Sequence, residues 1–375
     1  MSSHASPPQL PQLSVTEVLR RRLAVQRLVG PPLTSGTEVV RLLTCVQSQE
    51  HAHALWSLGL RCGLDASDLR SEFDQGHFVR THLLRPTWHF VAAADLRWIQ
   101  ALTASRVQQG NRGQYRAAGL SQDDLDRGRA VLADALTGRR YLTRPELAAV
   151  LAADGLVAAG HRLACLVMDA ELEGVLCSGP MRGAQHTYAL VEERLPAQPV
   201  RSEEDMLAML TWRFFAGHGP AGLKDYARWS SLTLAQAQAG IELVTDRLER
   251  VSSPQGELWH DPSVLEQPDG SRPVGAGPPP EGAVLLVPLF DEVSLSYPQL
   301  NFPVVPGHPH PPGPELHVGS VLLDTENVGT WRRTVQGRRV TVETDLAPGL
   351  GAAAEEAVVA AVRRLAGFLG RELAG

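Results

Sequence analysis

Three consecutive segments decide the fold: SQDDLDRGRAVLADAL (121–136), LTRPELAAVLAADG (142–155) and GHRLACLVMDAELEG (160–174). Apolar residues recur in them at helical spacing, Ser121 and Thr143 are N-cap residues, and Gly174 is a typical helix end. The following residues, 175–195, contain two strand-like runs joined by a polar turn. Three helices followed by a two-stranded wing predict a winged-helix module over residues 121–198.

The same order of elements returns over residues 199–262, where Ser202 and Thr233 are N-cap residues and a hairpin pattern closes the segment. Residues 1–120 are less regular. They contain two probable paired strands and four helical patterns, which cover residues 15–28, 36–47, 51–63 and 95–107. We interpret this part as an embellished third winged helix.

Residues 280–375 contain strand-like runs separated by turn residues, followed by an amphipathic helical pattern over residues 352–373. A Pro/Gly-rich stretch between His260 and Glu281 predicts a linker or long loop before them. The sequence therefore predicts an α+β protein, with three tandem winged-helix modules and a small β-barrel-like C-terminal domain.

Composition limits the class of protein. Of 375 residues, 43% are apolar and 20% are charged, as in ordinary globular proteins. Neither a membrane-spanning run nor a signal peptide is recognisable, so we expect a cytoplasmic protein. The four cysteines have no CxxC spacing, and no phosphate-binding, dinucleotide-binding or zinc-protease motif is present. We therefore expect no metal and no cofactor, and a monomer.

Charge is unevenly distributed along the chain. The net charge is −6, but residues 1–116 carry +5 and the remainder carries −11. Residues 80–116 contain six arginines and one acidic residue, Asp95. A basic surface of this kind can follow DNA phosphates, and the alternative is a solvated helix face in an arginine-rich chain.

Several segments together resemble the winged-helix DNA glycosylase family of the AlkZ type: CVQSQEHAHALWSLGLR (45–61), LLRPTWHFVAAADLRWI (83–99), CSGPMRGAQHTYAL (177–190), RWSSLTLAQAQAGIE (228–242), LLVPLFDEVSLSY (285–297) and VGTWRR (328–333). The resemblance implies tandem winged helices and a β-barrel around duplex DNA, and excision of N7-alkylated purines or crosslinked nucleotides. It also implies a catalytic Gln-aliphatic-Gln triplet, here Gln47, Ser48 and Gln49. Two departures are the serine at the centre of the triplet and FDEVSLSYPQLN (290–301), where relatives continue into a tyrosine and a basic pair.

Two carboxamides are sufficient for this reaction on chemical grounds. An N7-alkylated base is already cationic and leaves as a neutral molecule, so the protein has only to guide water to an oxocarbenium-like sugar. Gln47 and Gln49, expected at the end of one helix and the start of the next, can donate to and accept from that water. Glu50 is a candidate general base or stabiliser of positive charge. The alternatives are a hydrogen-bonding pair at a helix terminus and an ordinary acidic residue in a first helical turn.

Candidate DNA-binding residues surround the triplet. Alternation along a strand places Arg85, Thr87 and His89 on one face, opposite an apolar face. Together with Arg61 and Arg80 they are candidate phosphate ligands, and the alternative for the strand is a set of solvated side chains.

Lysine is nearly absent from the sequence. Lys224 is the only lysine, so a Schiff-base lyase has few amines to use. We therefore expect a monofunctional DNA glycosylase that acts on double-stranded DNA in base excision repair of alkylation damage. A non-catalytic winged-helix DNA-binding or regulatory protein is the alternative.

Overall fold

The computed structural model describes residues 10–264, 283–298, 300–308 and 318–374. Most of the predicted linker therefore lies outside the described residues. Helices and strands are mixed along the chain, as predicted for an α+β protein. In the described ranges no helix is long and apolar enough to span a membrane, and no cluster of three or more metal-ligating side chains is found.

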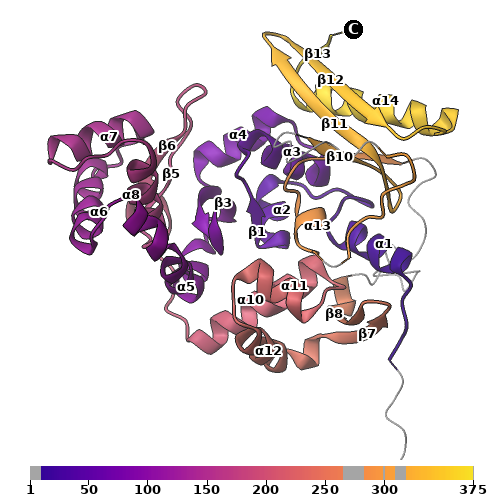
Figure 1. Ribbon diagram of the computed structural model, residues 1–375, viewed down its shortest axis with the longest axis horizontal. Helices are drawn as coiled ribbons and strands as arrows, with labels where there is room; N and C mark the ends of the chain where they lie inside the picture. The colour runs from indigo at the N-terminus through magenta and orange to yellow at the C-terminus, as the bar shows by residue number, and fades with distance from the viewer. Residues whose placement is uncertain (1–9, 265–282, 299, 309–317, 375) are drawn as a thin grey trace, which may run out of the picture.

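The N-terminal unit forms the centre of the molecule in Figure 1. Its elements are α1 (Val15–Val25), α2 (Gly36–Leu43), β1 (Cys45–Gln47), α3 (His51–Cys62), α4 (Ala66–Gln75), β2 (Phe78–Leu83), β3 (Arg85–Ala92) and α5 (Leu96–Ala117). The three strands form one sheet in the order β1-β3-β2.

One helix prediction in this unit is wrong. The helix expected over residues 36–47 ends at Leu43, because Thr44 has a φ of 65° and turns the chain. The next three residues, Cys45–Gln47, form an edge strand that pairs with β3. Gln47 therefore lies on a strand and not at the end of a helix.

The second unit consists of α6 (Gln122–Leu136), β4 (Leu142–Thr143), α7 (Arg144–Ala153), α8 (Gly160–Leu172), β5 (Leu176–Ser178), β6 (Thr187–Leu190) and α9 (Val191–Arg194). Its three long helices and the strands β5 and β6 follow the predicted order, whereas β4 and α9 were not predicted. The predicted caps are confirmed. Ser121 forms a capping box with Asp124, and Thr143 forms one with Glu146. An apolar core of its own, which includes Leu132 and Leu166, holds these helices together.

The third unit also follows the predicted order: α10 (Glu203–His218), α11 (Leu223–Ser230), α12 (Leu234–Leu243), η1 (Thr245–Arg247), β7 (Glu249–Ser253), β8 (Gly256–His260) and η2 (Pro262–Val264). Its buried aromatic side chains, Phe214 and Trp229 among them, share a core with Val79 and Ile99 of the N-terminal unit. The third unit is thereby packed directly against the sheet that carries the triplet.

The C-terminal unit consists of β9 (Val284–Val287), α13 (Glu292–Leu295), β10 (Gly319–Leu323), β11 (Glu326–Gln336), β12 (Arg339–Leu346), α14 (Ala352–Phe368) and β13 (Glu372–Leu373). Its five strands form one sheet in the order β13-β12-β11-β10-β9, which is antiparallel except for the pair β12-β13. As predicted, the terminal helix packs on this sheet. Leu365 and Phe368 belong to a core that continues into α3 of the N-terminal unit.

Candidate active site

The triplet Gln47-Ser48-Gln49 is extended and runs beside β3. Gln47 pairs with His89 in an antiparallel register, and the Ser48 N–H donates to the Trp88 carbonyl oxygen at 2.8 Å. Side chains alternate along an extended chain, so the two glutamines share one face and Ser48 has the other. Gln49 is exposed and Ser48 is completely buried, whereas Gln47 is 8% exposed.

Ser48, at the centre of the triplet, is buried at a position where the resemblance implies an aliphatic residue. Its hydroxyl is buried and has no hydrogen-bond partner among the described residues. The departure at Ser48 is therefore a change in the packing on the side of the triplet opposite the two glutamine side chains.

Arg85 holds the Gln47 amide. Its guanidinium donates to Oε1 of Gln47 at 3.1 Å and approaches Nε2 of His89 at 3.4 Å. Nδ1 of His89 lies 3.0 Å from the Thr87 carbonyl oxygen, which assigns the proton to Nδ1 and leaves Nε2 as the acceptor. Burial, followed by the positive charge of Arg85, lowers the pKa of His89 to about 3. A neutral imidazole thus orients Arg85, and Arg85 directs the Gln47 oxygen.

Arg80 fixes the main chain of the triplet. Its side chain donates to the carbonyl oxygens of Ser48 at 3.0 Å and Gln49 at 3.4 Å. The guanidinium also stacks on Trp88, 4.1 Å from the ring centroid. Only 8% of the residue is exposed, and burial lowers its pKa to about 10. The structure therefore gives Arg80 a positioning role, where the sequence had suggested a contact with DNA.

Trp88 is in turn held by the second unit. Its indole N–H donates to Oε2 of Glu171, on α8, at 3.3 Å. The same carboxylate oxygen accepts a hydrogen bond from Nδ1 of His82. Helix α8 thus supplies a buried carboxylate that supports the strand next to the triplet.

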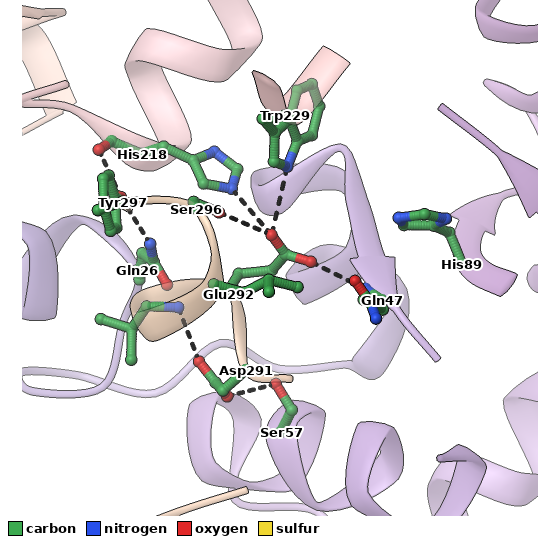
Figure 2. Close-up of polar contacts among 12 residues, drawn as sticks. Gln26, Gln47, Ser57, His89, His218, Trp229, Asp291, Glu292, Ser296 and Tyr297 are labelled. Atoms are coloured by element: carbon green, nitrogen blue, oxygen red, sulfur yellow. Dashed lines mark hydrogen bonds and ion pairs between the residues drawn. The ribbon is translucent and has the colours of Figure 1, made fainter. Parts of the chain in front are cut away.

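A buried carboxylate that the sequence did not single out lies behind Gln47. Figure 2 shows Glu292 surrounded by donors from three units. Oε1 accepts from the Gln47 N–H at 2.8 Å. Oε2 accepts from Ser296 at 2.8 Å and from the Trp229 indole at 3.2 Å, and it lies 3.8 Å from Nε2 of His218.

Glu292 is ionised in this environment. Burial alone would raise its pKa, but His218, Arg85 and the Gln47 N–H lower it to about 2. The signal that could have revealed it is an acidic pair, Asp291-Glu292, directly after the apolar run AVLLVPLF (283–290). Buried charges that follow a core strand are retained only when they are paired.

Asp291, the other member of the pair, corrects our prediction for Arg61. Arg61 is completely buried and forms a two-pronged ion pair with Asp291, at 2.9 and 2.7 Å. It also donates to Gln26, whose amide donates to the Tyr297 hydroxyl (Figure 2). No part of Arg61 is accessible to a phosphate, so it joins the C-terminal unit to α3 and does not bind DNA in this conformation.

The other site residues that the sequence predicted differ in how exposed they are. His89 is completely buried and its Nε2 faces the Arg85 guanidinium, so a contact with DNA would require this part of the chain to move. Arg85 and Thr87 are half-buried on the same face of β3, so their predicted contact with DNA stays a prediction. Glu50 is the N-cap residue of α3, and its carboxylate makes no capping hydrogen bond within the described chain.

A cleft of about 600 Å³ opens beside the triplet, between the N-terminal and second units. Gln49, Glu50 and Trp88 line one side, and Arg144 and Tyr188 line the other. A volume of this size is typical of small-molecule sites. Glu50 and the exposed amide of Gln49 thus face an open space large enough for a nucleobase, whereas Gln47 lies deeper.

These features define the chain as a protein with the fold of a DNA glycosylase. A solved structure of the DNA glycosylase AlkZ from Streptomyces sahachiroi matches it with a TM-score of 0.73 and 21% sequence identity, over 97% of this chain and 100% of that one. A family model described as "DNA glycosylase AlkZ-like" matches residues 40–368. The chain therefore belongs to the AlkZ-like DNA glycosylase family, as the resemblance implied.

The chain is also similar in sequence to a protein of named function. The "Interstrand DNA cross-link repair glycosylase" of Streptomyces sahachiroi is 28% identical over 224 residues. That alignment covers 58% of this chain and 60% of the relative.

Proposed function

We propose that this protein is a monofunctional DNA glycosylase that hydrolyses the N-glycosidic bond of N7-alkylated purine or crosslinked nucleotides in double-stranded DNA. The observation that carries the proposal is the arrangement of Gln47 and Gln49 on one face of an extended segment, with Arg85 fixing one amide and a cleft beside the other. The similarity to the interstrand DNA cross-link repair glycosylase of Streptomyces sahachiroi supports crosslinked DNA as a substrate.

Arg85 determines what Gln47 can offer. Only 8% of Gln47 is exposed and its oxygen accepts from Arg85, so we assign its NH₂ group as the part of the amide that donates to a sugar-phosphate or a water when DNA is bound. Gln49 is more weakly held, since its oxygen lies 3.5 Å from the Trp88 N–H. One glutamine therefore positions the nucleotide, and the other is free to orient the attacking water.

The transition state carries positive charge on the sugar, and two carboxylates are placed to stabilise it. Glu50 borders the cleft and acts as general base or counter-charge. Glu292 is ionised and hydrogen-bonded to the main chain of Gln47, so its negative charge is fixed behind the site. No lysine lines the cleft within the described residues, in keeping with hydrolysis in place of lyase chemistry.

The test is base release from a duplex that contains N7-methylguanine, measured under single-turnover conditions. We expect Gln47→Ala and Gln49→Ala to lower the rate by about 100-fold, the range found for positioned acid–base groups, with DNA affinity unchanged. Gln75→Ala, at the exposed end of α4, is the matched control. DNA binding by the wild-type protein without release of the methylated base or of a crosslinked nucleotide would instead indicate a non-catalytic DNA-binding protein.

The architecture of this enzyme is part of the proposal. We divide the chain into units 1–120, 121–198, 199–262 and 280–375, and we assign the first three as winged helices. The support is that the second and third units each have three helices followed by a hairpin. A monomer that presents these units around duplex DNA fits the size and charge distribution of the chain.

A further inference from the structure

A second depression, a groove of about 640 Å³, lies between α5 and the turn that joins α11 to α12, with Pro86 of β3 at its edge. Its polar and charged lining consists of Arg106, Gln109, Asn111, Gln114, Arg228 and Ser231. None of the described residues that line it is acidic. The lining therefore offers hydrogen-bond donors and positive charge, and Arg228 also interacts electrostatically with the buried Asp225.

The two arginines of the groove are available for a ligand. Arg106 and Arg228 are both exposed, and neither forms an ion pair with any residue that the structure describes. Arg228 makes one hydrogen bond, to the Leu295 carbonyl oxygen at 3.1 Å. By contrast, Arg97 at the start of α5 is paired with Glu192. Unpaired, solvent-facing guanidinium groups are the usual ligands of phosphate oxygens.

The helix surface in the groove is also open. Gly110 borders the groove, and a Cβ placed on it would meet no atom within 4 Å. The same is true of Gly113, one turn further along α5. A sugar-phosphate backbone can thus approach the helix without displacing a side chain.

The groove leads to the catalytic glutamines through β3. Pro86 lines the groove, and the preceding residue, Arg85, donates to the Gln47 oxygen. Arg228 is close enough to influence Arg85. Burial is the main cause of the lowered pKa of Arg85, and the positive charge of Arg228 lowers it further. Two like charges held near each other at this end of β3 are stabilised when an anion lies between them.

We propose that this groove binds the phosphodiester backbone of the DNA strand that carries the lesion, with Arg106 and Arg228 as phosphate ligands. The amides of Gln109 and Gln114 and the hydroxyl of Ser231 are donors of the kind that contact phosphate and sugar. A strand held there passes Pro86 and delivers its next sugar to Gln47 and Gln49. The inference rests on the proposed function for the reaction, but it concerns binding and is measured separately.

The experiment compares two double variants of the full chain by fluorescence anisotropy on an undamaged 20-base-pair duplex. In Arg106→Ala/Arg228→Ala we expect binding at least tenfold weaker, and a slope of log affinity against log salt that is reduced by about 2, one unit for each phosphate that is no longer bound. Arg112→Ala/Arg116→Ala removes the same charge from exposed positions of α5 that do not line the groove. Its affinity and salt slope should stay close to those of the wild type.

Thermal unfolding of both variants checks that each is still folded, which the exposure of all four arginines favours. Equal weakening of the two double variants would overturn the proposal, because it would show a diffuse effect of net charge. Unchanged binding by the groove variant would overturn it as well. Displacement of DNA from the groove by a polyglutamate peptide as readily as by unlabelled duplex would show a site for acidic protein and would also contradict it.

Failure of the proposed function has a different signature. In that case the groove variant still loses affinity for the duplex, but the wild-type protein releases no base from the N7-methylguanine duplex. Conversely, if the chemistry holds and the groove is wrong, base release at saturating enzyme is intact and the groove variant binds as the wild type does.

Discussion

The main-chain N–H of Gln47 donates to Oε1 of Glu292 at 2.8 Å, although the two residues are 245 positions apart in the chain. Gln47 ends β1 in the N-terminal unit, and Glu292 begins α13 in the C-terminal unit. The position of the first glutamine therefore depends on the folding of the last unit. Since Trp229 of the third unit donates to the same carboxylate, three units meet at this one residue.

Replacement of Glu292 by glutamine tests this connection. Glu292→Gln keeps the shape but removes a buried charge that accepts hydrogen bonds from Gln47, Trp229 and Ser296, and this loss should lower the free energy of unfolding by about 2 kcal/mol. We also expect slower base release with nearly unchanged DNA affinity, because a neutral amide holds the main chain of Gln47 less strongly than the carboxylate does. Urea unfolding and single-turnover rates measure the two effects.

Glu343→Gln is the matched control for Glu292→Gln. Glu343 pairs with Arg332 on the exposed face of β11 and β12, and such surface pairs contribute at most about 1 kcal/mol. Equal destabilisation by the two substitutions would show that the carboxylate behind Gln47 has no special role.

Local signals predicted the helices of the second unit well. Ser121 and Thr143 are the N-cap residues that the sequence indicated, and both caps act within four residues of chain. The extended segment at Cys45–Gln47 was missed because its cause is not local. It pairs with β3, more than forty residues away, and the apolar pattern around it also fits a helix.

Distant contacts also explain why only part of the site was predicted. Gln47 and Gln49 were found from the triplet, but the partners that hold them come from distant segments: Arg80 from β2, Glu171 from α8 and Glu292 from α13. An arginine in a sequence gives no sign of whether it faces solvent. Arg61 and Arg228 look alike in the sequence, and only the fold shows that one is buried in an ion pair and the other exposed.

Ser48 provides a test of packing behind the triplet. Because its buried hydroxyl lacks a partner among the described residues, Ser48→Ala should leave the protein as stable as the wild type or raise the unfolding free energy by about 1 kcal/mol. The rate of base release should change by less than twofold. Thermal unfolding and the excision assay check both expectations, and a marked loss of stability would mean that the hydroxyl has a partner after all.

His89 makes stability depend on pH. Its pKa in the folded protein is about 3, below the ordinary value of 6.5, so the unfolded chain binds more protons between these values. Neutral His89 makes its full contribution to the free energy of unfolding above about pH 6.5. Below that pH the contribution falls by about 1.4 kcal/mol for each pH unit. The difference in unfolding free energy between wild type and His89→Gln should therefore shrink as the pH falls from 7 to 5. Parallel curves over this range would contradict a buried neutral imidazole beside Arg85.

Lys224 tests the class of chemistry. It is exposed on α11, it is the only lysine in the sequence, and it lines neither the cleft nor the groove. A Schiff base needs an amine at the sugar, so we expect no borohydride-trapped complex between the protein and DNA, and an abasic product that stays unbroken until it is treated with alkali. Lys224→Ala should release base at the wild-type rate. A trapped complex seen on a denaturing gel would show lyase activity, and its loss in Lys224→Ala would identify this lysine as the nucleophile.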